Sequence, residues 1–174
     1  ELLEKNIEFN PTNVQQMKKA GPKILAEVDD ALKEYFGDYE VFSSEEMLYV
    51  PIENFNIFFK GFVDAVVKVG DTYHLFDWKT CSWGWDSRKK AEKLVTYQLT
   101  LYKHFFCQKH KIDPEKVETH FALLKRTAKK DRVEIFRVTS GSKKTENALK
   151  LLYQAIYNIN KKVTIGEAAN ALMA

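Results

Sequence analysis

The sequence predicts a single α/β (α+β) domain with a central mixed β-sheet flanked by helices on both faces. Three observations lead to this prediction. The chain has 174 residues, of which 45% are hydrophobic, and this is enough for one core of ordinary size. Helix-like and strand-like segments follow one another in the order α-β-β-β-α-β-β-α. The strands on either side of Gly70 carry apolar residues on both faces, so both faces of the sheet need a covering layer.

The first half of the chain is predicted to contain two helices followed by three strands. Pro11–Ala20 and Pro22–Phe36 are predicted as separate helices, because Gly21-Pro22 is a typical break. Gly37 ends the second helix. Strands are then expected at Val41–Ile52, Phe58–Lys68 and Thr72–Thr80.

The second half begins with an aromatic loop, Cys81–Ser87, and continues with a helix from about Arg88 to Lys109. Two further strands are predicted at Val117–Lys125 and Arg132–Val138, and a last helix ends near Lys161. The whole chain is therefore expected to be one domain, residues 1–174, with residues 1–20 and 163–174 at its periphery.

Composition excludes several classes of protein. A net charge of +3 permits a nucleic-acid partner but does not require one. With only Cys81 and Cys107, the chain cannot supply a disulfide framework or four thiolates, so no iron–sulfur cluster is expected. No segment has the length and apolarity of a membrane span and no signal peptide is visible, so an intracellular, cytoplasmic protein without a membrane partner is expected. The four histidines show no ligand spacing, and none is assigned a role.

Two aspartates are expected to face each other across a hairpin. Gly70-Asp71 is a tight-turn signal, with glycine supplying the positive φ. A turn centred there places Asp64 directly opposite Asp77. Opposed side chains have Cβ atoms roughly 4.5–5.5 Å apart. At ~4 Å and an effective dielectric constant of about 20, two like charges repel by about 4 kcal/mol. A positive group is therefore expected between them.

Lys79 lies two residues after Asp77 and points from the same face of the strand. Two carboxylates and a lysine on one face are the parts of a metal-dependent phosphodiesterase. Mg²⁺ or Mn²⁺ takes carboxylate and carbonyl oxygens as ligands, polarises a phosphate and lowers the pKa of water. Lys79 could orient the attacking water or stabilise charge on the phosphorane. The alternative is a carboxylate pair that shares a proton at a sheet edge.

A third acid is expected on the preceding strand. A symmetric turn over Glu53–Asn56 places Glu45 opposite Asp64. A three-residue loop would shift the register by one residue and make Glu46 the third acid instead. Glu45 is favoured, and both remain candidates as catalytic or metal-binding acids.

Several other residues could contact the substrate. Gln98 and Tyr102 share one face of a helix, where they could hold the metal site and a scissile phosphate, or could be rim and core residues. Trp83 and Trp85 could stack on unpaired bases, or could cover the core. Basic residues that flank the acidic pair could follow a phosphate backbone, although each run alone is typical of solvated surface: Arg88, Lys89, Lys90, Lys93, Lys125, Arg126, Lys129 and Lys130.

Three motifs in order carry a resemblance. They are Gly61-x-x-Asp64, Asp77-x-Lys79 and Gln98-x-x-x-Tyr102. Together they resemble the PD-(D/E)xK nuclease superfamily in its RecB-like branch, and the D-W-K-T form resembles that of the mitochondrial genome maintenance exonuclease and related phage exonucleases. The resemblance implies a restriction-endonuclease-like core. It also implies that Asp64 and Asp77 bind metal, joined by the carbonyl of Trp78, that Lys79 is the catalytic lysine, and that Gln98 and Tyr102 belong to the site.

One feature departs from that family. Many RecB-like nucleases carry a metal-binding histidine on the N-terminal helix, but Pro22–Phe36 has none. Leu25 stands about where it would fall, and Glu27 is a possible substitute. One metal or two therefore stays open.

The function expected from the sequence is a Mg²⁺- or Mn²⁺-dependent deoxyribonuclease. An exonuclease that acts on single-stranded DNA or free ends is favoured over a sequence-specific endonuclease, and a phage or viral origin is one possibility. The alternative is a nucleic-acid-binding module that kept the fold and lost catalysis. A protein-interaction scaffold would leave the opposed aspartates unexplained, and the sequence identifies no protein partner.

Overall fold

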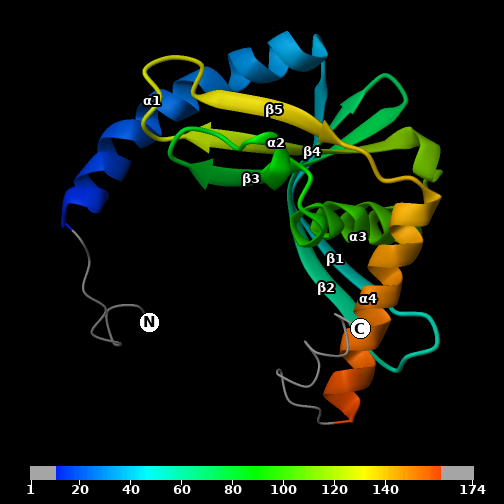
Figure 1. The fold of residues 1–174 in the computed structure, drawn as a ribbon. Coiled ribbons are helices and arrows are strands. Elements are labelled where there is room, and N and C mark those ends of the chain that lie inside the picture. Colours follow the sequence, from blue (N-terminus) through cyan, green and yellow to red (C-terminus); the bar gives the residue numbers. More distant parts are fainter. Residues whose placement is uncertain (1–10, 162–174) are drawn as a thin grey trace.

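Five strands form one mixed sheet in the computed structural model, which describes residues 11–161 (Figure 1). The strands lie in the sheet in their sequence order: β1 (Glu40–Pro51), β2 (Phe58–Val69), β3 (Thr72–Cys81), β4 (Val117–Lys125) and β5 (Val133–Val138). The pairings β1–β2, β2–β3 and β4–β5 are antiparallel, whereas β3–β4 is parallel. The predicted mixed sheet is therefore confirmed.

Helices cover both faces of this sheet, as the sequence predicts. Helix α1 (Pro11–Phe36) lies across one face, and α3 (Lys93–His110) and α4 (Ser142–Asn160) lie against the other (Figure 1). Leu32 of α1 packs in a cluster with Val67 and Phe76. Phe105 and Phe106 of α3 pack in a second cluster with Leu48 and Leu75. Two short elements complete the described chain: α2 (Ser87–Lys90) and the 3-10 turn η2 (Pro114–Lys116).

Two predicted helix boundaries are wrong. Helix α1 continues through Pro22 instead of breaking there. Proline normally disfavours helical geometry in the preceding residue by clashing with its Cβ, and Gly21 has none. Conversely, the helix predicted from Arg88 to Lys109 is divided after Lys90. Asp86 caps the short α2 by accepting a hydrogen bond from the backbone nitrogen of Lys89 at 2.7 Å, and α3 then begins separately.

The register of β2 and β3 is the predicted one. Gly70 has a φ of 56° in the turn, and the pairs run from Val69–Thr72 to Ala65–Phe76. Asp64 and Asp77 are the next residue on each strand, at the end of this paired segment. The turn chemistry around Gly70 thus sets the positions of the two aspartates.

Strand β2 is irregular at Asp64. Val63 and Val66 both pack in the cluster on the α3 side, whereas Ala65 packs on the α1 side. The regular alternation expected of a strand would instead put Val63 and Ala65 on one face. On β1, Ser44 pairs with Ala65 and Glu46 pairs with Val63, and Glu45 between them has a φ of 51°. Positive φ in a residue other than glycine marks a local break in strand geometry. Figure 1 shows β1 and β2 curving away from the other strands along α3 and α4.

Within residues 11–161, none of the helices is both long enough and apolar enough to cross a bilayer. The segment 163–174 and the first part of 1–20, predicted to be peripheral, lie outside the described residues.

Candidate active site

Asp77 is the centre of a polar group between β3 and α3. Its side chain is nearly inaccessible, with the residue 4% exposed. Gln98 on α3 donates a hydrogen bond from Nε2 to Oδ1 at 2.9 Å. The other oxygen, Oδ2, lies 2.6 Å from Nζ of Lys79, but no group among residues 11–161 donates a well-oriented hydrogen bond to it. One oxygen of a buried carboxylate is therefore incompletely satisfied.

Burial raises the pKa of Asp77 above its usual value. Lys79 opposes this shift through the close contact of its ammonium with the carboxylate and through its positive charge, while the nearby charge of Asp64 raises the pKa further. Since desolvation disfavours the ionised form, the carboxylate would gain from a further positive charge.

Asp64 reaches the same place from β2. Its Oδ2 accepts a hydrogen bond from the backbone nitrogen of Trp78 at 2.7 Å, and that nitrogen belongs to the peptide bond between Asp77 and Trp78. The half-buried Asp64 carboxylate thus lies against the backbone that carries Asp77. The structure brings together the two acids that the hairpin register placed opposite each other.

Gln98 links the lysine, the aspartate and a tyrosine through its two amide ends. Its Oε1 accepts a hydrogen bond from Nζ of Lys79 at 3.3 Å, and its Nε2 donates to the hydroxyl of Tyr102 at 3.1 Å as well as to Asp77. Gln98 and Tyr102 are one turn apart on α3, so both side chains face β3. Positions that a helix pattern alone would assign to rim and core are therefore both in this polar group.

Gly61 leaves room for the Tyr102 ring. A Cβ atom at position 61 would lie 2.9 Å from Cε1 of Tyr102 and 3.2 Å from Cε1 of Phe59. Real Cβ contacts are not this short, so any larger residue would displace the ring or the strand. The glycine of the first motif and the tyrosine of the third are thus coupled by direct packing.

The two candidates for a third acid have different surroundings. Oε1 of Glu46 accepts a hydrogen bond from Nζ of Lys109 at 2.7 Å and lies 2.8 Å from Nε2 of His110. Lys109 is at the end of α3, roughly 16 Å along the helix from Gln98. The carboxylate of Glu46 is therefore held away from Asp77, whereas Glu45 is exposed on β1.

Glu27, considered as a substitute for the absent histidine, is engaged elsewhere. Its carboxylate accepts hydrogen bonds from the backbone nitrogen of Arg132, at 2.8 Å, and from the guanidinium of the same residue. Leu25, at the position expected for that histidine, is 72% exposed.

The two tryptophans of the aromatic loop divide into one exposed and one packed residue. Trp83 is 73% exposed. Trp85 packs on Phe121, with ring centroids 5.3 Å apart, and the ammonium of Lys89 lies 5.1 Å from its ring. Only Trp83 presents a free ring to solvent, while Trp85 covers the core.

The basic residues near the loop also differ in their partners. Arg88 and Lys89 are exposed on α2. Lys125 is half-buried and shares the Glu134 carboxylate with Lys90, at 3.4 and 2.6 Å respectively. Arg126 donates a hydrogen bond to Oγ of Ser82 at 3.2 Å.

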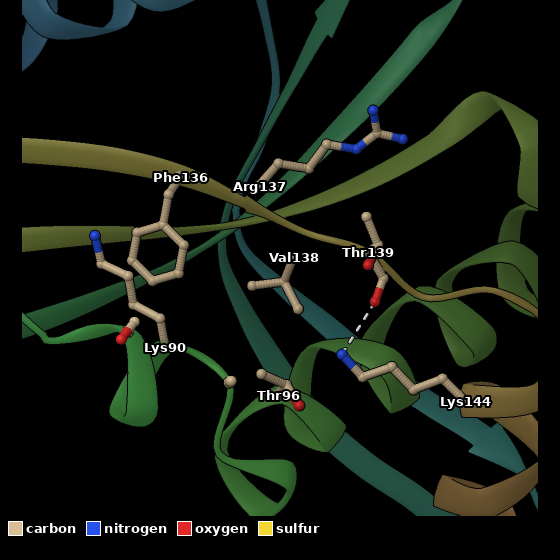
Figure 2. Close-up of a pocket in the computed structure, with 9 residues that line it drawn as sticks. Lys90, Thr96, Phe136, Arg137, Val138, Thr139 and Lys144 are labelled. Atoms are coloured by element: carbon tan, nitrogen blue, oxygen red, sulfur yellow. Dashed lines mark hydrogen bonds between the residues drawn. The ribbon is translucent and has the colours of Figure 1, made fainter.

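A pocket beside β5 lacks the groups for metal chemistry. Figure 2 shows Lys144 reaching the backbone carbonyl of Thr139, at 3.0 Å, and Lys90 beside the ring of Phe136. None of the nine lining residues is acidic. The guanidinium of Arg137 points away from Lys90 and Thr96, and it pairs with Glu118 at 2.8 Å.

The structure also brings together three residues that the sequence left unassigned: His74, Glu118 and His120. Glu118 and His120 are two residues apart on β4, so their side chains lie on the same face of the sheet. His74 joins them only because β3 and β4 pair in parallel. Sequence spacing alone could not reveal this pairing, because a helix separates the two strands.

Comparison with known proteins gives one family match. The model of the PD-(D/E)XK nuclease superfamily matches residues 3–170. No curated protein matches this chain.

Two solved structures are similar to this chain, and the first of them has a similar fold. A protein described as a "Putative exonuclease" from Eubacterium rectale is 14% identical, with a TM-score of 0.57 over 88% of this chain and 56% of that chain. A second structure, SSO0001, is 14% identical, with a TM-score of 0.46 over 85% of this chain and 61% of that chain. The chain thus spans less than two thirds of either structure.

Proposed function

Because this chain belongs to the PD-(D/E)XK nuclease superfamily, we propose that it is a Mg²⁺- or Mn²⁺-dependent deoxyribonuclease with Asp64, Asp77 and Lys79 at its catalytic centre. The observation that carries the proposal is the incompletely satisfied oxygen Oδ2 of Asp77, buried between Lys79 and α3. The proposed nuclease domain covers residues 1–174.

The donor set fits a hard divalent cation. Asp77 and Asp64 supply carboxylate oxygens, and the backbone carbonyl of Trp78 is the proposed third protein ligand. Oxygen donors of this kind are those that Mg²⁺ and Mn²⁺ prefer. When bound, such a cation supplies positive charge to a phosphodiester and lowers the pKa of water.

Lys79 is proposed to act on the reacting groups. Its ammonium is held by contacts to Asp77 and Gln98, while its side chain remains 32% exposed. One side of the ammonium can therefore donate to the attacking water or to a phosphate oxygen. A preorganised charge of this kind acts mainly where negative charge develops in the transition state.

Gln98 and Tyr102 are proposed to position that centre. Gln98 fixes both Asp77 and Lys79, so it limits their rotation. The Tyr102 hydroxyl accepts from Gln98, which leaves its own proton free to donate to a phosphate oxygen. Glu45, exposed on the neighbouring strand, is the remaining candidate for a third acid.

Single-stranded DNA or a free DNA end is the proposed substrate. The exposed Trp83 ring offers a stacking surface for an unpaired base, and the exposed Arg88 and Lys89 lie shortly after it in the chain. The description of the Eubacterium rectale protein as an exonuclease supports attack at ends.

A cleavage assay tests this proposal. End-labelled single-stranded DNA, double-stranded DNA and RNA are incubated with the purified protein in Mg²⁺, Mn²⁺ or EDTA. We expect metal-dependent cleavage of DNA that begins at an end, and no cleavage by Asp77→Asn. Asp71→Asn is the matched control, because that acid lies in the β2–β3 turn with its side chain 87% exposed. Failure to cut any substrate with either metal would contradict the proposal.

A further inference from the structure

A second group of potential metal ligands lies on the opposite face of the sheet from Asp77. His74 on β3 pairs directly with Glu118 on β4, and His120 follows two residues later on the same face of β4. Phe36 of α1 packs on the His74 ring with centroids 4.6 Å apart, whereas Asp77 bonds to Gln98 of α3. The sheet itself therefore separates this group from the proposed nuclease centre.

The three ligand atoms have the spacing of a metal site. Nδ1 of His74 lies 3.1 Å from Nε2 of His120 and 3.5 Å from Oε2 of Glu118, and the last two atoms are 3.8 Å apart. A tetrahedral Zn²⁺ with bonds of about 2.0–2.1 Å separates its ligand atoms by about 3.3–3.4 Å. The observed triangle thus requires only small adjustments to hold one ion.

Both histidines are in the protonation state that a metal needs. Burial lowers the pKa of His74, a shift that the Glu118 charge opposes and the Arg137 charge reinforces. Burial, together with the charges of His74 and Arg137, lowers the pKa of His120 to about 3. Neutral imidazole is the ligating form. Nδ1 of His74 and Nε2 of His120 are hydrogen-bonded at 3.1 Å, so one of these two nitrogens carries a proton, which shifts to the other nitrogen of its ring when a metal binds.

The surroundings of the group are apolar on one side and polar on the other, and Nδ1 of His120 is buried without a hydrogen-bond partner among residues 11–161. The rings of Tyr35, Phe36 and Phe76 surround His120, with centroids 5.6, 5.4 and 5.3 Å from it, so the inner side is apolar. Glu118 is on the solvent side at 25% exposure, and Arg137 holds its second oxygen at 2.8 Å. Outer partners of this kind orient a ligating carboxylate.

We propose that His74, Glu118 and His120 bind one Zn²⁺ ion that links β3 to β4 beneath the end of α1. Two imidazoles and one carboxylate favour Zn²⁺ over Mg²⁺, because Mg²⁺ prefers oxygen ligands. Three protein ligands leave a fourth position for water on the Glu118 side. The ion stabilises the parallel strand pair and takes no part in phosphodiester cleavage.

The test is zinc binding by a protein in which the nuclease centre is disabled. Metal-stripped Asp64→Asn/Asp77→Asn protein is titrated with ZnCl₂, and bound zinc per chain, affinity and Tm are measured. We expect about one zinc per chain and a rise in Tm. Co²⁺ in place of zinc should give the visible absorption of a tetrahedral N/O site. No zinc uptake by this protein would overturn the proposal, whatever the outcome of the cleavage assay.

Single substitutions in the same background locate the ion. His74→Gln and His120→Gln should each weaken zinc binding at least tenfold. His104→Gln should leave it unchanged, because His104 is a half-buried histidine on α3, outside the group. If the fully buried His120 cannot be replaced without unfolding, Glu118→Gln on the solvent side replaces it in the test. Zinc affinity that survives both His74→Gln and Glu118→Gln would contradict the assignment.

Discussion

Lys79 places its Nζ 2.6 Å from Oδ2 of Asp77, yet its orientation leaves that oxygen without a hydrogen bond. The contact is therefore electrostatic, and it offsets only part of the desolvation of a buried carboxylate. Asp77 is held in position by Gln98 on its other oxygen. The buried carboxylate of Asp77 would therefore be stabilised by an additional cation, and without one it does not stabilise the folded protein.

Asp77→Asn should abolish cleavage without lowering the Tm of the metal-free protein. Burial raises the pKa of Asp77, so its ionised form is disfavoured in the folded state, and asparagine keeps an oxygen for Gln98. Thermal unfolding in EDTA at neutral pH measures the effect, with Asp71→Asn as the control. A clear drop in Tm for Asp77→Asn alone would show that Asp77 is structural.

Gly61→Ala should impair both stability and cleavage by displacing Tyr102. The added methyl group would lie 2.9 Å from the Tyr102 ring, and overpacking of this kind costs about 1–3 kcal/mol. Tyr102→Ala removes the nearer obstacle, while the Phe59 ring stays 3.2 Å from the added methyl group. Gly61→Ala should therefore cost less stability in the Tyr102→Ala background than in the wild type. Additive losses of stability in this cycle would show that Gly61 acts through some other contact.

Trp83 and Trp85 should give opposite phenotypes. Trp83→Ala should weaken binding of single-stranded DNA by roughly 1–3 kcal/mol while the Tm is unchanged, since the ring is 73% exposed. Trp85→Ala should lower the free energy of unfolding by roughly 2–4 kcal/mol, since that ring packs on Phe121. Fluorescence anisotropy and thermal unfolding separate the two effects. Unchanged DNA affinity in Trp83→Ala would remove the stacking role.

Glu134→Gln should destabilise the protein in a pH-dependent way. Burial alone would raise the pKa of Glu134, but the hydrogen bonds and charges of Lys90 and Lys125 outweigh it and hold the pKa below 4.5. Because the pKa is lower in the folded state, this stabilisation is present above pH 4.5 and is lost as the pH falls through the folded pKa.

The Tm difference between wild type and Glu134→Gln should therefore be largest near neutral pH and shrink on acidification. The side chain is 31% exposed, so the effect should be about 1 kcal/mol or less. A Tm difference that does not shrink when the pH falls from 4.5 to below the folded pKa of Glu134 would contradict the pairing with the two lysines.

The local chemistry of the sequence was sufficient to predict the β2–β3 hairpin. Gly70 determines the turn, and the turn determines the positions of Asp64 and Asp77. The same reasoning gave the helical spacing of Gln98 and Tyr102. These features depend on neighbours within a few residues, so the periodicity of the side chains and the residues of the turn are enough to predict them.

Features that depend on distant packing could not be predicted in this way. Glu46 accepts a hydrogen bond from Lys109 at the end of α3. His74 lies beside His120 only because β3 and β4 pair in parallel. The continuity of α1 through Pro22 has no local signal, because proline within a helix removes a hydrogen bond and clashes with the preceding turn. Gly21 lacks a Cβ and so relieves only one part of this clash. The irregularity of β2 at Asp64 has no signal in the alternation of its side chains.

Single-turnover cleavage by Lys79→Ala tests the proposed catalytic centre most directly. Labelled single-stranded DNA with Mn²⁺ gives the cleavage rate, and the same DNA with Ca²⁺ gives the Kd and its salt dependence. A lysine that acts in the transition state predicts a rate at least about 100-fold lower, with the Kd nearly unchanged. The contradicting result is a wild-type protein that cuts no DNA or RNA, together with a Lys79→Ala variant whose only defect is weaker binding and a salt slope smaller by about one.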